Sequence, residues 1–155
     1  MFRIEEGRNP AILVSLNRFV HEWHVKAYPD IFRDGEDICL ESYFKSSLEK
    51  PNFHHFIAYD DSKAVGFVQV EIRNFPGNSF RHPQKLIFLH IIVVLPEYRG
   101  KGVGQLLMDE VYGLASKNNI SRIELDHWAG NDSAASFFGK MGFKPYRYFL
   151  FLERK

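Results

Sequence analysis

The spacing of apolar residues in the first third of the chain predicts one short strand and two helices. A strand is expected at residues 3–5. Apolar residues between 13 and 27 then recur at helical spacing, after an Asn9-Pro10 pair that supplies a helix cap and a first-turn proline. Pro29 should end this helix, and a second helix is predicted from about residue 36 to residue 48. The chain therefore opens with a strand and a helical pair.

The middle of the chain has the alternation of β-strands. Residues 53–59 and 63–73 are rich in β-forming side chains and are joined by Asp60-Asp61-Ser62. In the second run, apolar residues alternate with polar ones, which predicts a half-buried hairpin. Residues 86–94 are apolar on both faces except at His90, as expected of a central strand that is covered on each side.

The last third alternates between helix and strand. Apolar residues from 103 to 114 predict a helix, residues 121–128 a strand, and residues 132–140 a helix that Gly142 closes. A final strand or hairpin is expected at 143–153. This order predicts an α/β fold, with a mixed, mainly antiparallel central sheet of six to seven strands flanked by about four helices.

Composition limits the functions that this fold can serve. The chain has 155 residues, 45% of them hydrophobic, so we expect one domain spanning 1–155. A formal charge of +1 gives no field that would attract nucleic acid or a membrane, and neither partner is expected. The single cysteine, Cys39, cannot form a disulfide framework, and it is expected to be half-buried. No apolar leader opens the chain, so a cytoplasmic location fits best.

A glycine-rich turn follows the predicted central strand and leads directly into a helix. Glycine lets the backbone take positive φ angles and approach a ligand, and a helix start offers unpaired N–H groups at the positive end of its dipole. Such a corner fits a pyrophosphate, held mainly by main-chain N–H groups with help from two basic side chains. The residues predicted to form it are Arg99, Gly100, Lys101, Gly102, Val103 and Gly104.

Two common glycine motifs do not fit this spacing. A dinucleotide fingerprint needs Gly-x-Gly-x-x-Gly after an early strand, and a P-loop needs Gly-x-x-x-x-Gly-Lys-Ser/Thr. The turn, with Val94-x-Pro96 before it, instead resembles the acetyl-CoA-binding motif of the GNAT superfamily. The family's later motif has its counterpart in Asn131-x-x-Ala134-x-x-Phe137-Phe138-x-x-x-Gly142-Phe143, which also follows a strand and starts a helix.

The resemblance implies a GNAT fold and acetyl-CoA as co-substrate. By kinship, the backbone of Val94 would pair with the pantetheine arm where two neighbouring strands splay apart, residues 99–104 would hold the pyrophosphate, and Asn131 would line the cofactor slot. The contacts carried over from the family are completed by Ile92, Phe137 and Phe138.

One position departs from the family pattern. Many members have a tyrosine where this chain has Phe138, and that hydroxyl is proposed to protonate the leaving thiolate. Without it, the proton must come from water, from the ammonium product, or from another tyrosine such as Tyr146 or Tyr148. A thiol with a pKa of about 8.5 leaves tolerably as the thiolate, so the substitution need not abolish acetyl transfer.

An amine attacks a thioester only as the free base, so a general base is wanted. His90 is the first candidate, because it is the one titratable group in the predicted central strand and strict alternation would place it on the face of Ile92 and Val94. The alternative is a structural histidine that hydrogen-bonds a neighbour. Asp126 and His127 come next, although they are better explained as residues that bound the following loop.

Three side chains of the first predicted helix share one side. His21, His24 and Tyr28 are spaced to line an acceptor pocket. The His-x-x-His spacing also suggests a metal, but no third ligand accompanies it, and His54 and His55 face opposite ways on a strand. We therefore expect no metal.

The sequence thus predicts an enzyme, an N-acetyltransferase that moves an acetyl group from acetyl-CoA directly to a primary amine of a small molecule or peptide. A non-catalytic acyl-CoA-binding or sensing module is the main alternative, and a phosphate-binding regulatory domain ranks last. The identity of the amine is left open, as is the choice between a monomer and a homodimer.

Overall fold

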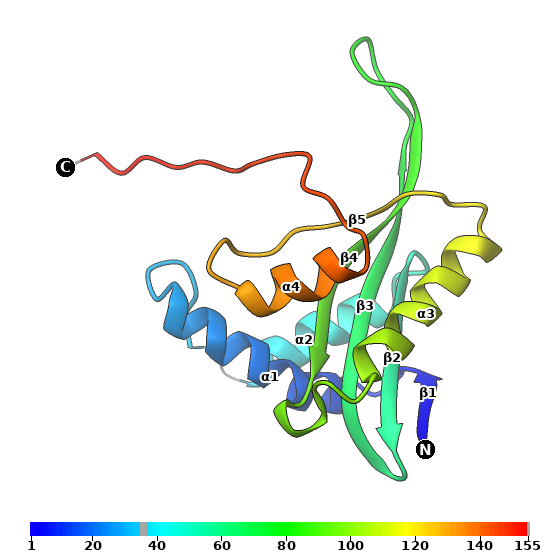
Figure 1. The fold of residues 1–155 in the computed structure, drawn as a ribbon, viewed down its shortest axis with the longest axis vertical. Helices are drawn as coiled ribbons and strands as arrows, with labels where there is room; N and C mark the ends of the chain where they lie inside the picture. The colour runs from blue at the N-terminus through cyan, green and yellow to red at the C-terminus, as the bar shows by residue number, and fades with distance from the viewer. Residues whose placement is uncertain (35–36, 155) are drawn as a thin grey trace.

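A single sheet of five strands organises residues 1–34 and 37–154, the part of the chain that the computed structural model describes (Figure 1). Neighbouring strands are antiparallel from β1 to β4, and β5 is parallel to β4. In spatial order, the strands are β1 (Phe2–Glu6), β2 (Phe53–Asp60), β3 (Lys63–Phe75), β4 (Gln84–Val94) and β5 (Ile123–Leu125).

Helices cover both faces of the sheet. One core packs α1 (Pro10–Ala27) and α2 (Asp37–Leu48) against side chains such as Phe67 and Val93. The other core packs α3 (Val103–Lys117) and α4 (Asp132–Lys140) against Val68, Leu89 and their neighbours. A short 3-10 helix, η1 (Pro96–Tyr98), joins β4 to the turn before α3. The mixed sheet and the four α-helices of the described chain agree with the prediction.

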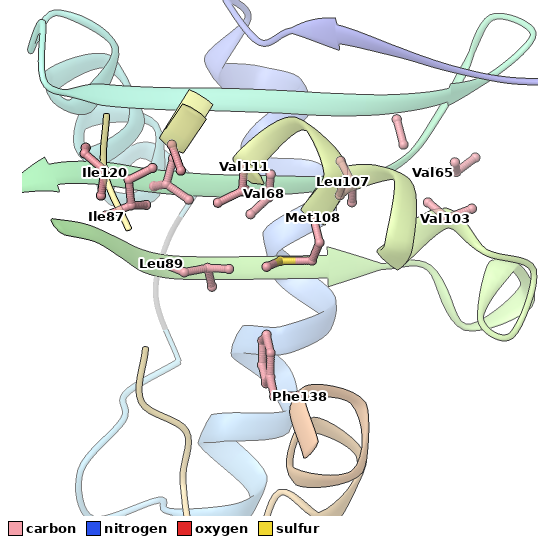
Figure 2. Packing of buried hydrophobic residues seen from close by; sticks show 13 residues of the cluster. Val65, Val68, Ile87, Leu89, Val103, Leu107, Met108, Val111, Ile120 and Phe138 are labelled. Carbon is pink, nitrogen blue, oxygen red and sulfur yellow. The ribbon is translucent and has the colours of Figure 1, made fainter. Parts of the chain in front are cut away.

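The core beneath α3 fixes the position of that helix on the sheet. Leu107, Met108 and Val111 are fully buried and point from α3 toward β3 and β4, as Figure 2 shows. Phe138 reaches the same cluster from α4. Burying each of these side chains contributes on the order of 1.5–3 kcal/mol, so the start of α3 is held firmly at the end of β4.

The predicted caps and stops place the helix ends. The Asn9 side chain accepts a hydrogen bond of 3.0 Å from the backbone N–H of Ala11, and Pro10 occupies the first turn of α1. Gly142 has a φ of +87° just after α4, as predicted for the residue that ends this helix. The expected start of α2 at residue 36 lies outside the described residues.

The β2–β3 hairpin is more deeply buried than the alternation predicted. Gln69 is fully buried, because α1 and α2 cover this face and its side chain has polar partners there. Its amide nitrogen lies 3.0 Å from Nε2 of His55, and the Tyr43 hydroxyl donates to its oxygen at 3.0 Å. Burial lowers the pKa of His55 to about 4, so the ring is neutral and its Nε2 accepts the bond from Gln69.

Two predicted strands differ from the structure. The strand expected at 121–128 pairs only over residues 123–125, and residues 144–154 contain no strand at all. This last segment, which we call the C-terminal arm, extends away from the body of the protein (Figure 1). The described sheet therefore has five strands instead of six to seven.

Candidate functional site

The predicted anion site lies where β4 gives way to α3. Gly100 and Gly102 have φ angles of +74° and +86°, so both positions favour glycine, as the sequence indicated. A Cβ atom added at either residue would have no neighbour within 4 Å, which means that the two glycines border open space. The turn thus presents bare backbone at its surface.

The start of α3 adds hydrogen-bond donors to this turn. Leu106 is the first residue of the helix whose N–H bonds back, to the carbonyl of Gly102 at 3.1 Å, and no side chain caps the helix at Gly102. The N–H groups of the first turn, from Val103 onward, are therefore left for an external acceptor. This arrangement suits an anion with several oxygens.

The basic side chains of the turn are exposed. The Arg99 side chain donates through Nε to the carbonyl oxygen of Val94 at 3.2 Å. The ammonium groups of Lys101 and Lys63 each lie 5.2 Å from the centre of the Tyr98 ring. Lys63 also donates to the Glu97 carboxylate at 3.1 Å. Arg99 and Lys101 thus place two cations beside the turn without occupying the helix start.

Gly104 has a different role from the one that the sequence suggested. It lies inside α3, it is absent from the residues with positive φ, and a Cβ atom there would come within 2.9 Å of the Phe137 ring. The missing side chain thus allows α3 and α4 to approach each other. The backbone of Gly104 belongs to the first turn of α3, and the absence of a Cβ leaves room for the Phe137 ring.

A gap between β4 and β5 begins next to this turn. The two parallel strands pair only through Ile87 with Ile123, Phe88 with Glu124, and Leu89 with Leu125. Residues 90–94 have no β5 partner in the described chain, although β3 still pairs with residues 91–94 from the other side. Apart from the Val94 carbonyl, which accepts from Arg99, this stretch of β4 therefore offers unpaired backbone N–H and C=O groups along an edge that leads to the glycine turn.

The α4 residues of the second motif border the same region in different ways. Asn131 caps α4 by accepting a hydrogen bond of 3.0 Å from the N–H of Ala134, so its side-chain oxygen is already engaged. Phe137 is half-buried against Gly104. Phe138 is only 5% exposed and packs between the rings of Phe137 and Phe143. Of the aromatic pair, Phe137 is the one nearer the open turn.

His90 lies where β4 and β5 part, but not on the predicted face. Val70 pairs with Leu89 and Gln69 pairs with Ile91, so His90 is an extra residue that forms a bulge. The bulge reverses the alternation. Ile92 and Val94 pack in the α3 core, whereas the His90 ring stacks on Phe53 and packs against Phe88 on the other face of the sheet.

The partner of His90 is Glu71, a residue that no motif in the sequence indicated. Nε2 of His90 lies 2.8 Å from a carboxylate oxygen of Glu71, which also accepts from Arg73 at 2.9 Å, while Asn52 donates to the second oxygen at 3.2 Å. Burial acts to raise the pKa of Glu71, but the hydrogen bonds from His90 and Arg73 outweigh it and leave the pKa below its usual value. The carboxylate therefore stays ionised beside the imidazole. Only knowledge of the β3–β4 register would have revealed this pair.

The predicted acceptor residues of α1 join an aromatic cluster. The Tyr28 ring packs at a tilt against Trp128, with 4.4 Å between the ring centres, and its hydroxyl accepts from the Gly130 N–H at 3.3 Å. The His24 ring stacks on Phe32 at 4.7 Å. Burial and, less strongly, the charge of nearby His21 lower the pKa of His24. The first half of α1 packs on the end of β4, and its last residues contact the loop after β5. The helix thus spans the gap between the two strands.

The remaining candidate residues from the sequence lie farther from the gap between β4 and β5. His21 bonds the carbonyl oxygen of Arg33 through Nε2 at 2.9 Å, which holds the loop after α1. The imidazole of His127 lies 3.1 Å from the carbonyl oxygen of Trp128, and both Asp126 and His127 are exposed. Tyr146 and Tyr148 belong to the C-terminal arm, outside the gap, and Cys39 is exposed instead of half-buried.

Among the described residues, no three His, Cys, Asp or Glu side chains are grouped so that they would hold a metal ion. The described helices also include none that combines the length and apolar character needed to span a bilayer.

Comparisons of the sequence with known proteins point to one family. The sequence model of the acetyltransferase (GNAT) family matches residues 17–143. An uncharacterized N-acetyltransferase from Archaeoglobus fulgidus is 32% identical over 112 residues, which cover 68% of this chain and 73% of that protein.

Solved structures share the fold along nearly the whole chain. A tetramutant of the BH1408 protein from Bacillus halodurans superposes with a TM-score of 0.93 at 22% identity, covering 98% of this chain and 99% of that one. The aminoglycoside N-acetyltransferase AAC(6')-Iy in complex with CoA gives a TM-score of 0.74 at 19% identity, covering 100% of this chain and 95% of that one. At these identities the likeness shows the fold alone, and it confirms the fold that the motifs implied.

Proposed function

Because this chain belongs to the GNAT family of acetyltransferases, we propose that it transfers an acetyl group from acetyl-CoA to a primary amine in one direct step. The observation that carries the proposal is the separation of β4 from β5 after Leu89 and Leu125, beside a glycine turn with a free helix start. A slot with an anion site at one end matches a donor that has a thioester at one end and phosphates at the other.

The donor would lie along β4. Its pyrophosphate would accept hydrogen bonds from the first-turn N–H groups of α3, near Gly102 and Val103, with Arg99 and Lys101 at the rim. Its pantetheine amides would pair with the unpaired β4 edge at Ile92 and Val94, as an added strand would. A backbone N–H of the same edge would polarise the thioester carbonyl.

His90 is proposed as the general base. It stands where the strands part, on the face that α1 and α2 cover, while the α3 helix start borders the opposite core. An amine that enters from the α1 side would give its proton to the imidazole, and the Glu71 carboxylate at 2.8 Å would stabilise the imidazolium that forms. The bulge that disagrees with the simple alternation thus turns His90 toward the acceptor side.

The leaving thiolate would be protonated without a side chain at position 138. Phe138 has no hydroxyl and is buried in the α3 core, so it contributes packing only. Water or the ammonium product supplies the proton in this proposal, because Tyr146 and Tyr148 lie on the C-terminal arm.

The acceptor would approach along the aromatic end of α1. His24 and Tyr28, with Trp128, form a wall beside the gap that would contact the apolar part of an amine, and His21 would shape its edge. Burial favours the uncharged form of His24, so this wall adds no fixed positive charge that would repel an ammonium group. We place the acceptor here by geometry and leave its identity to experiment.

An amine-panel assay tests the function. Purified protein, acetyl-CoA and single amines are incubated, and products are identified by mass while free thiol is measured in parallel. The proposal requires an acetylated amine and one equivalent of free CoA. Tight acetyl-CoA binding without release of CoA across polyamines, amino acids, peptides and aminoglycosides would instead favour a non-catalytic sensing module.

A further inference from the structure

A groove of about 640 Å³ opens on the face of the sheet opposite α3, and its inner end lies beside the proposed base. Glu71, the partner of His90, lines this end together with Phe88, whose ring packs against the His90 imidazole. From there the groove follows β3 and β4 toward their connecting loop, where the hairpin extends beyond the helices (Figure 1). Its lining residues belong to strands, loops and the C-terminal arm, and none comes from a helix. This part of the sheet face is therefore open to a ligand.

The register between β3 and β4 forms the floor of the groove. Because alternate residues of a strand face the same side, side chains from the two strands line up in cross-strand pairs. These pairs are Glu71 with Phe88, Arg73 with Leu86, and Phe75 with Gln84. The guanidinium carbon of Arg73 lies 4.0 Å from the centre of the Phe88 ring, and its Nε donates to Glu71 at 2.9 Å. The floor thus presents apolar surface with a carboxylate at its inner end.

The two carboxylates among the described lining residues already have cationic or hydrogen-bonding partners. Glu71 accepts from Arg73, and Nε2 of His90 lies 2.8 Å from it. Glu124 accepts a hydrogen bond of 2.6 Å from Nε of Arg122. Both carboxylates are therefore engaged locally and do not neutralise a cation farther out along the groove.

Two guanidinium groups of the groove form no ion pair with another residue of 1–34 and 37–154. Arg81 packs over the Phe75 ring at 5.0 Å, and Arg147 lines the groove from the base of the C-terminal arm. The Asn78 side-chain oxygen accepts from the Arg81 N–H at 2.9 Å, which fixes the backbone that carries this guanidinium. A guanidinium packed on a ring keeps its N–H donors for a further acceptor. The outer end of the groove thus offers paired donors to a carboxylate.

The separation of the two ends sets the length of a ligand that would reach both. Glu71 and Phe75 are four residues apart on β3, and a strand rises about 3.3 Å per residue, so about 13 Å separates them. An extended peptide of about four residues has this length. A single amino acid is too short to place its amine at His90 and its carboxylate at Arg81, and a polyamine has no anion for Arg81.

We propose that this groove binds an extended peptide with a free amino group at His90 and a carboxylate about four residues farther on, held by Arg81. Acetylation of that amino group rests on the proposed function, whereas binding of the carboxylate does not. In the transfer, the amine nitrogen forms a bond to the acetyl carbon, the carbon–sulfur bond of the thioester breaks, and His90 takes one proton. The carboxylate end takes no part in the chemistry and only positions the peptide.

Opposite charges at the two ends determine the direction in which the peptide lies. A reversed peptide would place its carboxylate against Glu71 and its ammonium group against Arg81, and both contacts are repulsive. The wall formed by His24, Tyr28 and Trp128 lies beyond the end of β5, in the opposite direction from the groove. It would therefore contact the first residue of the peptide, while the groove holds the rest.

Calorimetric titration with tetraalanine compares the free acid with its C-terminal amide, which lacks the negative charge. The full chain is titrated with and without saturating CoA, and no acetyl donor is present. We expect the acid to bind at least about 10-fold more tightly than the amide. Arg81→Gln should bring the acid to the affinity of the amide, whereas Arg8→Gln, at an exposed arginine before α1, should keep the preference. Equal affinities of acid and amide in the parent would overturn the proposal.

A charge reversal tests the same contact through a gain of binding, which a misfolded variant would not show. Arg81→Glu should bind Ala-Ala-Ala-Lys amide about 10-fold more tightly than the parent does, because the lysine then meets a carboxylate. In the parent, Ala-Ala-Ala-Glu-Ala amide shows whether an acidic side chain serves as well as a terminal carboxylate. If Arg81→Glu gains no affinity for the lysine peptide, the fourth residue does not lie at Arg81 and the proposal fails.

Acetylation assays with the same peptides separate this inference from the proposed function. If the acid preference and its dependence on Arg81 are found but neither acetylated peptide nor free CoA appears, the proposed transfer fails while the groove assignment holds. Acetylation of the acid and the amide with the same KM would overturn the groove assignment and leave the transfer in place.

Discussion

Leu89 pairs with Leu125 in the last step of the ladder between β4 and β5, and the next residue of β4 is the bulged His90. The end of the pairing and the bulge thus coincide. Backbone groups become available on one edge of β4 at the point where an imidazole turns to the face opposite α3. A reaction that needs a bound carbonyl and a nearby base would find both at this position.

The glycine turn can be tested by one methyl group. Gly102→Ala places a Cβ at a φ of +86°, which costs about 1–2 kcal/mol in the left-handed region and reshapes the donors at the start of α3. We expect acetyl-CoA affinity to fall at least 10-fold in calorimetric titration. Gly113→Ala is the matched control, since this α3 glycine has open space around its Cβ position and no positive φ. Equal affinity in the two variants would contradict the turn assignment.

Gly104 is expected to act through packing. Its substitution by alanine puts a Cβ within 2.9 Å of the Phe137 ring, and such overpacking costs about 1–3 kcal/mol. Urea unfolding should show this loss in the free energy of unfolding. Combining Gly104→Ala with Phe137→Leu should cost less than the sum of the two single changes, because the smaller side chain makes room. Strict additivity would show that the ring and the added methyl group do not meet.

The His90–Glu71 pair predicts a specific change in kinetics. His90→Gln should lower kcat about 10²–10⁴-fold while the KM for acetyl-CoA stays near the parent value. Glu71→Gln should lower kcat less and move the acidic limb of the pH–rate profile to lower pH, because the imidazolium loses its carboxylate partner. His82→Gln, in the exposed loop between β3 and β4, serves as the control. A purely structural His90 would leave the shape of the profile unchanged in every variant.

His55 predicts how stability depends on pH. Its pKa falls from 6.5 in the unfolded chain to about 4 in the folded protein, so between these values the unfolded chain binds the additional proton. The neutral His55 therefore contributes about 3 kcal/mol to the free energy of unfolding above pH 6.5, and this contribution is lost as the pH falls toward 4. Urea unfolding at several pH values measures how the free energy of unfolding changes with pH. Between pH 4 and 6.5, this change should be smaller in His55→Gln than in the parent. His127→Gln, an exposed control, should keep the parental slope.

Local signals in the sequence were sufficient for most of the fold. The cap at Asn9 and the stop at Gly142 act within a few residues, so they place the start of α1 and the end of α4 without tertiary information. The two family motifs likewise identified the turn before α3 and its position after a central strand.

The remaining differences depend on contacts between distant segments. The bulge at His90 is a property of the register between β3 and β4, and the burial of Gln69 depends on α2 supplying Tyr43. Gly104 looked like a ligand-facing glycine because the sequence does not show that Phe137 fills the space beside it. β5 is short because only residues 123–125 pair with β4, and the arm forms no strand because its backbone has no partner in the described chain.

The most direct test of the account is a crystal structure of the protein with CoA. We predict that the pyrophosphate lies on the first-turn N–H groups of α3, next to Gly102, with the pantetheine arm along residues 90–94 in the gap that opens after Leu125. A pyrophosphate bound elsewhere, or pantetheine excluded because β5 closes on that stretch of β4, would contradict the proposed site and the acetyl transfer built on it.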